Sequence, residues 1–104
     1  MRISFIDTLI KEIDKGHDIY LLTADLGFGL FDQIREKYPE RFINVGVAEQ
    51  NMVSVAAGMA LDGKIVFCYS MIPFLLMRAF EQIRVDVCNH FLNVRFIGVG
   101  SGYG

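Results

Sequence analysis

Two carboxylate side chains that could do chemistry stand within four residues of the end of a short apolar stretch. Glu49 follows the apolar stretch 42–45, and Asp25 follows the stretch 19–23. A carboxyl group acts as a proton donor or acceptor when burial favours its neutral form, whereas the first turn of a helix favours its charged form. For Glu49 we expect burial to win in an assembled site. An ordinary acid in a first helical turn and a turn aspartate beside glycine are the structural alternatives for the two residues.

Alternating helices and strands are predicted to position these carboxylates. Ser4 is predicted to cap the first helix, since apolar residues recur at helical spacing after it until Gly16. Helices are predicted over 5–13, 30–38, 48–61 and 73–89, and strands over 19–23, 42–45, 64–69 and 94–99.

Continuous apolar strands that alternate with helices are typical of a parallel sheet covered on both faces. The fold class is therefore predicted as α/β, with three layers, a mainly parallel sheet and helices on both faces. Ligands of such sheets bind beyond the carboxyl ends of the strands. The segments at that edge are predicted to be 25–29, 46–51, 70–74 and 98–104.

Length and composition indicate one compact domain with a partner surface. The 104 residues are 53% apolar, which is more apolar surface than a lone domain of this size easily buries. Ten basic and twelve acidic residues are interspersed and form no basic stripe, so a nucleic-acid partner is not expected. The uncharged stretch 65–77 is too short to span a bilayer and contains Pro73, so no membrane span is predicted.

Cysteine use and the first residues favour a cytoplasmic protein. Charged residues precede any apolar run of the kind that a secretory signal needs. Cys68 and Cys88 form no CxxC pair, which favours reduced core thiols over zinc ligands. His17 and His90 are interpreted as solvent-exposed or helix-end residues.

Three segments together resemble the pyrimidine-binding domain of transketolase-like enzymes. They are TADLG at 23–27, FINVGVAEQN at 42–51 and AAGMA at 56–60. The part NVGVAEQ is similar to the segment that carries the catalytic glutamate in transketolases and in deoxyxylulose-phosphate synthase, and RAFEQ at 78–82 follows in order. The resemblance implies that residues 1–104 are a thiamine-diphosphate-binding fold of the pyrimidine type, incomplete at the C-terminus, like the C-terminal section of split transketolases.

The resemblance implies thiamine diphosphate as cofactor and assigns roles to several residues. Glu49 matches the carboxyl group that hydrogen-bonds N1′ of the aminopyrimidine and so lets the cofactor remove its own C2 proton. Asp25 and Leu26 match a loop near the thiazolium side of the cofactor. Arg78 matches an arginine that some members hold near cofactor or substrate, although Glu81 could equally pair with it on the surface.

An aromatic face for the pyrimidine is also implied, with Phe67, Tyr69 and Phe74 as candidates. The sequence departs from the family pattern here, because the expected phenylalanine can align with Ile72, Phe74 or Leu75. We favour Phe74. Alternation along a buried strand favours a core position for Phe67.

Nothing in the sequence resembles the family's diphosphate and magnesium motif, a GDG followed at a distance by asparagine. The phosphates and magnesium are therefore expected to bind to a partner chain or domain, in a homo- or hetero-oligomer. The implied reaction transfers a two-carbon ketol unit between sugar phosphates. The alternatives are deoxyxylulose-phosphate synthase, the beta-type subunit of a 2-oxo-acid dehydrogenase, and a non-catalytic interaction module.

Overall fold

The computed structural model describes residues 2–24, 29, 31–46, 49–71 and 93–99, and the structural statements below concern these residues. Its elements are α1 (Arg2–Asp14), β1 (Ile19–Thr23), α2 (Asp32–Lys37), the 3-10 helix η1 (Pro39–Arg41), β2 (Phe42–Asn44), α3 (Glu49–Leu61), β3 (Ile65–Met71) and β4 (Val94–Val99). The predicted helix over 73–89 lies outside the described residues. None of the described helices is long and apolar enough to cross a membrane.

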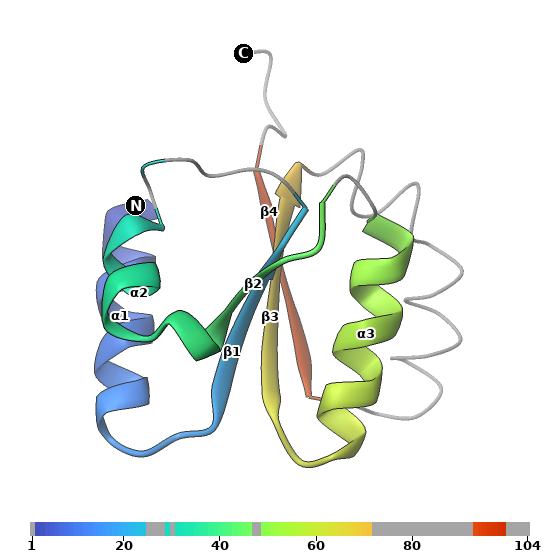
Figure 1. Cartoon of the computed structure of the whole chain (residues 1–104), viewed down its shortest axis with the longest axis horizontal. Coiled ribbons are helices and arrows are strands. Elements are labelled where there is room, and N and C mark those ends of the chain that lie inside the picture. The colour runs from blue at the N-terminus through green and yellow to red at the C-terminus, as the bar shows by residue number, and fades with distance from the viewer. Residues whose placement is uncertain (1, 25–28, 30, 47–48, 72–92, 100–104) are drawn as a thin grey trace.

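The four strands form one parallel sheet in the order β2-β1-β3-β4. Helices α1 and α2 lie on one face of this sheet and α3 lies on the other (Figure 1). The structure thus confirms the predicted α/β class with its three layers. β2 is an edge strand whose Phe42 and Ile43 pack against the cores on opposite faces of the sheet, and its last residue, Asn44, is exposed.

Side chains of alternate strand residues point to opposite faces of the sheet and belong to two separate cores. On the face of α1 and α2, Leu21 and Phe31 are fully buried. On the face of α3, Leu22 and Val66 are fully buried. Burying a large apolar side chain stabilises the fold by about 1.5–3 kcal/mol, so these two cores are the main source of its stability.

Small side chains let α3 lie close to the sheet. Ala56, Ala57 and Ala60 are 0%, 4% and 9% exposed and belong to the core on that face. The small side chains of α3 therefore pack directly against the sheet. On the outer side of the helix, Val55 and Leu61 are 37% and 67% exposed.

The first helix begins earlier than predicted. α1 begins at Arg2, so Ser4 lies inside its first turn and is not the cap. The residues before Ser4 tolerate helical backbone, and the helix extends through them. The predicted stop is confirmed, because Gly16 has φ +96 and its N–H donates to the carbonyl of Ile13 at 2.9 Å.

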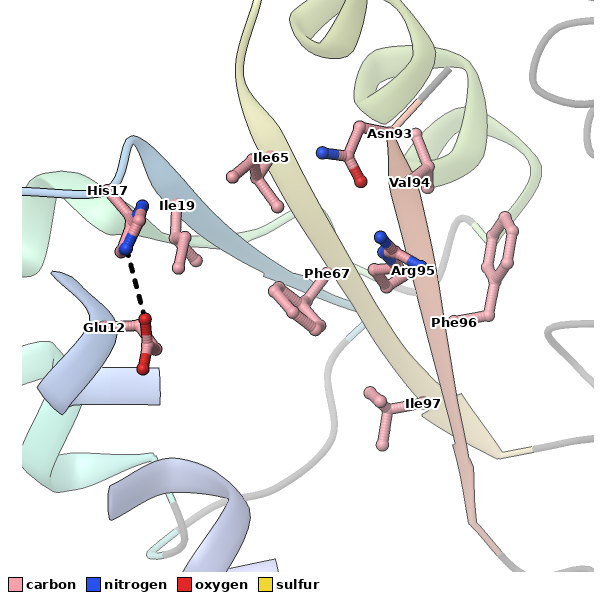
Figure 2. Close-up of a pocket in the computed structure, with 10 residues that line it drawn as sticks. All are labelled: Glu12, His17, Ile19, Ile65, Phe67, Asn93, Val94, Arg95, Phe96 and Ile97. Carbon is pink, nitrogen blue, oxygen red and sulfur yellow. Dashed lines mark ion pairs between the residues drawn. The ribbon is translucent and has the colours of Figure 1, made fainter. Parts of the chain in front are cut away.

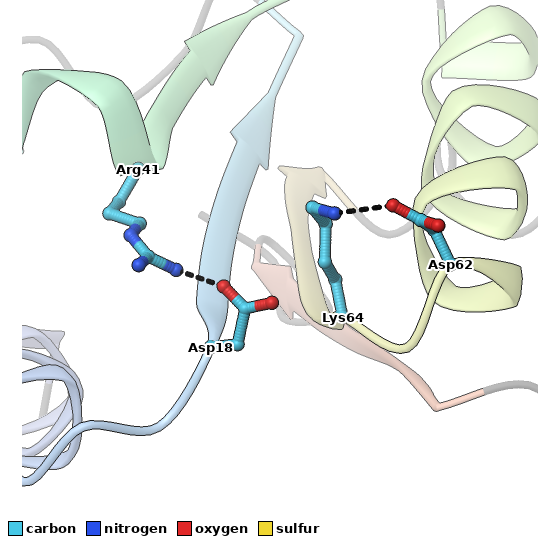
Figure 3. Close-up of polar contacts among 4 residues, drawn as sticks. All are labelled: Asp18, Arg41, Asp62 and Lys64. Atoms are coloured by element: carbon cyan, nitrogen blue, oxygen red, sulfur yellow. Dashed lines mark hydrogen bonds and ion pairs between the residues drawn. The ribbon is translucent and has the colours of Figure 1, made fainter.

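Two ion pairs lie at the amino-terminal end of the sheet (Figure 3). The Arg41 guanidinium bonds Asp18, and the Lys64 ammonium lies 2.8 Å from Asp62. The guanidinium of Arg41 is 4.7 Å from the centroid of the Tyr20 ring, and the Lys64 ammonium is 5.8 Å from it. Exposed pairs of this kind contribute little to stability, because water screens them. They lie at the end of the strands opposite to the predicted site.

Candidate functional site

The carboxyl ends of three strands lie side by side at one edge of the sheet. Thr23, the last residue of β1, pairs with Asn44 of β2 on one side and with Tyr69 of β3 on the other. The predicted site segments 25–29 and 46–51 therefore start from neighbouring strands, at the upper edge of the sheet in Figure 1. This is the edge at which open parallel sheets bind ligands.

Two hydrogen bonds hold the backbone just beyond β2. The N–H of Val45 donates to the carbonyl of Thr23 at 2.9 Å, and the N–H of Gly46 donates to Oδ1 of Asn44 at 2.9 Å. Gly46 has φ +77, in the left-handed region that glycine adopts without strain. These bonds tie the first residues after β2 to the ends of β1 and β2.

Glu49 is the first residue of α3, as the sequence predicted. The N–H groups of a first turn have no partner within the helix, and the helix dipole places partial positive charge there. Met52 and Val53 are fully buried one turn later, which anchors this end of the helix on the sheet. A carboxyl group at this position can accept a hydrogen bond from an N–H group of a bound ring, or it can share a proton with a ring nitrogen. The catalytic role of Glu49 stays a prediction.

The rings of Tyr69 and Phe67 pack on the sheet face opposite to α3. Tyr69 is 2% exposed, and its ring centroid lies 4.8 Å from that of Phe31 in an edge contact at 89°. The Phe67 centroid lies 5.7 Å from that of Phe5 at 61°. A contact between Tyr69 and a bound ring would require one of these core rings to move. Cofactor contact by either residue stays a prediction.

The other predicted cofactor residues lie outside the described residues. They are Asp25, Leu26, Phe74 and Arg78, and their roles stay predictions. Within the described part of the chain, no group of three or more His, Cys, Asp and Glu side chains is placed to hold a metal ion.

The Cys68 thiol is a core group, as predicted. Cys68 is fully buried between β3 and α3, and this burial raises the pKa of its thiol to about 12. The thiol is therefore neutral at physiological pH and is a poor nucleophile. Cys88 lies outside the described residues. His17 is exposed as predicted, and its Nε2 lies 3.3 Å from the Glu12 carboxylate.

An open groove that was not predicted from the sequence runs along β3 and β4. This β3–β4 groove lies between α1 and β4 and has a volume of about 740 Å³ (Figure 2). Its lining includes Glu12, His17, Ile65, Phe67, Arg95 and Ile97. Its signal in the sequence is Arg95, a charged residue inside the otherwise apolar strand 94–99.

Comparison with known proteins identifies relatives for the whole chain. The model of the family described as "Transketolase, pyrimidine binding domain" matches residues 1–104. The chain is 43% identical over 103 residues to the "Putative transketolase C-terminal section" of Methanocaldococcus jannaschii, a match that covers 98% of this chain and 33% of that protein. It is 38% identical over 98 residues to one subunit of an apulose-4-phosphate transketolase of Actinobacillus succinogenes, covering 93% and 32%.

Further relatives share the fold and part of the sequence. The chain is 44% identical over 93 residues to a 1-deoxy-D-xylulose-5-phosphate synthase of Synechococcus, covering 86% of this chain and 14% of that enzyme. A solved structure, "Split gene transketolase, inactive beta4 tetramer", matches with TM-score 0.78 and 37% identity, covering 93% of this chain and 32% of the other. The chain spans about a third of the length of the split relatives that it matches.

Proposed function

Because the chain belongs to the family of transketolase pyrimidine-binding domains, we propose that it forms half of a thiamine-diphosphate site in which Glu49 activates the cofactor. One observation carries this proposal. Glu49 begins α3 directly beyond β2, at the edge where the ends of β1, β2 and β3 lie side by side. A carboxyl group at the start of a helix on this edge suits the recognition of a ring nitrogen.

The proposed reaction transfers a two-carbon ketol unit between sugar phosphates. Bound thiamine diphosphate supplies the nucleophilic carbon for this transfer. Relatives named as transketolases match almost the whole chain, which supports this reaction class.

Glu49 has the task of holding one proton between its carboxyl group and N1′ of the aminopyrimidine. The helix N-terminus favours the carboxylate form, while burial against an apolar ring raises the pKa of a carboxyl group. Closing the site with a partner removes water and strengthens the second effect. We therefore expect the proton to be shared between Glu49 and N1′ in the assembled site.

The remaining proposed contacts come from two segments next to Glu49. Asp25 and Leu26 follow β1, whose end pairs with the end of β2, and are proposed to line the thiazolium side. Phe74 is proposed as the aromatic face for the pyrimidine, since Tyr69 is already packed against a core ring. Arg78 is proposed to lie near cofactor or substrate.

A partner is proposed to supply the groups that bind the diphosphate and magnesium. One relative is named as a subunit and another as a C-terminal section, and a structural neighbour is described as an inactive tetramer of beta chains. These descriptions support an enzyme that needs a second kind of chain or domain. We place the assembly in the cytoplasm.

Deoxyxylulose-phosphate synthesis is the second candidate. The 44% identity to a 1-deoxy-D-xylulose-5-phosphate synthase favours it, although that match covers only 14% of the relative. Glu49 would have the same function in both reactions. The reactions differ in the substrate that donates the two-carbon unit. Assays with a ketose phosphate and with pyruvate distinguish them.

The test is ketol transfer by the assembled protein. The protein is combined with the product of a neighbouring gene that carries the GDG motif, with thiamine diphosphate and magnesium. We expect Glu49→Gln to lower kcat on the order of 100-fold or more, the scale of a lost acid-base group. The control Glu36→Gln removes an exposed carboxylate from α2 and leaves kcat unchanged. Equal rates in both variants, or a stable complex without activity, would favour a non-catalytic interaction module.

A further inference from the structure

β2 is the shortest of the four described strands. It has three residues, lies at an edge of the described sheet and pairs with residues 21–23 of β1. β1 and β3 have five and seven residues and lie in the middle of the sheet. The residues of β2 are half-buried or exposed. A short edge strand of this kind opens locally more easily than the middle of a sheet, so contacts outside the backbone ladder matter for holding it in place.

Two aspartates hold the segment that leads into β2. The Lys37 ammonium lies 3.1 Å from the Asp14 carboxylate, and the Tyr38 hydroxyl donates to the same carboxylate. The Arg41 guanidinium donates to the carboxylate of Asp18 (Figure 3). Asp14 is the last residue of α1, and Asp18 directly precedes β1. The approach to β2 is therefore tied to the connection between α1 and β1.

These contacts differ from the other ion pairs that the structure describes. The pairs Lys37–Asp14 and Arg41–Asp18 each join residues 23 positions apart. The other described pairs join near neighbours along the chain and hold no separate element in place. Both long-range pairs therefore act on the same junction, the start of β2 beside the start of β1.

Arg41 extends the pairing of β1 and β2 by one step. It directly precedes Phe42, and Tyr20 directly precedes Leu21, the register partner of Phe42. The Arg41 guanidinium lies 4.7 Å from the centroid of the Tyr20 ring, and its side chain is 25% exposed. A guanidinium is attracted both to an aromatic face and to a carboxylate. Arg41 thus holds β1 through Tyr20 and Asp18 at the point where the backbone ladder ends.

We propose that Arg41 is a positioning residue of the cofactor site, because its contacts with β1 keep β2 docked on that strand. The bond from the N–H of Val45 to the carbonyl of Thr23 forms only while β2 is docked, and Glu49 follows Gly46 by three positions in the sequence. The cofactor then binds the docked state and stabilises it. The role in cofactor binding rests on the proposed function, whereas the docking role does not.

The first test measures the local opening of β2 by amide hydrogen exchange, without cofactor. The reporter is the N–H of Val45, which donates to the carbonyl of Thr23 at 2.9 Å. The reference is the N–H of Val66 in β3, which donates to the carbonyl of Asn93 at 3.1 Å. Mass spectrometry with fragmentation to single residues gives both rates. Their comparison separates the opening of β2 from a loss of stability in the whole sheet.

We expect Arg41→Ala and Asp18→Ala each to speed exchange at Val45 about fivefold, the scale of one lost ion pair, and to leave Val66 unchanged. Arg41→Lys keeps the cation and should stay close to the native rate. Lys15→Ala is the matched control, because it removes an ion pair that does not touch β2. An unchanged rate at Val45, or equal acceleration at both amides, would overturn the proposal.

The second test measures ketol transfer at varied thiamine diphosphate in the protein assembled with its partner. Because only the docked state binds cofactor, Arg41→Ala should raise the KM for thiamine diphosphate about twofold to fivefold at unchanged kcat. Arg41→Lys should restore the KM. An unchanged KM, or a lower kcat at the native KM, would overturn the positioning role.

The two tests separate this inference from the proposed function. If Glu49→Gln leaves the activity unchanged, the proposed function fails, and exchange at Val45 still shows whether Arg41 holds β2. If Glu49→Gln abolishes activity while Arg41→Ala leaves exchange at Val45 unchanged, the proposed function stands and the positioning role of Arg41 is refuted.

Discussion

Phe31 links the core to the edge of the sheet that carries the candidate site. It is 0% exposed and follows the predicted site segment 25–29. The centroid of its ring lies 4.8 Å from that of Tyr69 at 89°, and 5.3 Å from that of Phe42 at 47°. Replacing Phe31 therefore tests whether these rings hold β1, β2 and β3 together beside the site.

The expected loss of folding free energy follows from the burial of Phe31 and from these two ring contacts. Phe31→Ala removes a fully buried ring and is expected to lower the free energy of unfolding by about 3–5 kcal/mol. Phe31→Leu keeps most of the apolar volume and loses two aromatic contacts of about 0.5–1.5 kcal/mol each, so about 1–3 kcal/mol is expected. Since domains of this size are stable by about 5–15 kcal/mol, the alanine variant is predicted to lose between a fifth and all of the stability.

Urea unfolding followed by circular dichroism measures these costs. The midpoint should move to lower urea with an unchanged m-value, since the surface exposed on unfolding is the same. Phe5→Leu is the matched control, because Phe5 is half-buried and makes a single ring contact at 5.7 Å. The reasoning is refuted if Phe31→Leu costs no more free energy than Phe5→Leu.

Two further predictions follow from perturbed pKa values. Burial raises the pKa of the Cys68 thiol from 9.0 to about 12, so between these pH values only the unfolded state loses the proton. Stability should fall by about 1.4 kcal/mol per pH unit from this group, and Cys68→Ala should show a shallower decline in alkaline urea titrations. The Tyr38 hydroxyl donates to the Asp14 carboxylate and, with Lys37, lowers the pKa of Asp14 below 3.8. Tyr38→Phe should raise that pKa in a carbon-13 NMR titration and should reduce the stability lost as the pH falls below about 4; an unmoved pKa contradicts the hydrogen bond.

Local sequence patterns predicted most of the fold. The apolar runs 19–23 and 94–99 became β1 and β4 with the same bounds, because continuous β-branched and apolar stretches end at clear breaks. The helix predicted over 30–38 is shorter, Asp32–Lys37, since Phe31 and Tyr38 flank it in non-helical backbone. The order of the strands depends on crossovers between distant segments, and local periodicity carries no such information.

Features of the candidate site that follow from the order of elements along the chain were predicted. Features that depend on packing between the sheet and the helices were not. Glu49 begins a helix directly after a strand, and this placement is visible in the sequence. The packing of Tyr69 against Phe31 depends on which sheet face α1 and α2 cover, which alternation alone does not define. The β3–β4 groove depends on helix spacing over the sheet, and only Arg95 indicated it in the sequence.

The most direct test of the central claim is the rate at which bound thiamine diphosphate exchanges its C2 hydrogen for deuterium. The rate is measured by acid quench and proton NMR in the protein assembled with its partner. If Glu49 activates the cofactor, Glu49→Gln lowers the rate on the order of 100-fold while the cofactor stays bound, and Glu36→Gln leaves it unchanged. An unchanged exchange rate in Glu49→Gln with bound cofactor would contradict the proposed function.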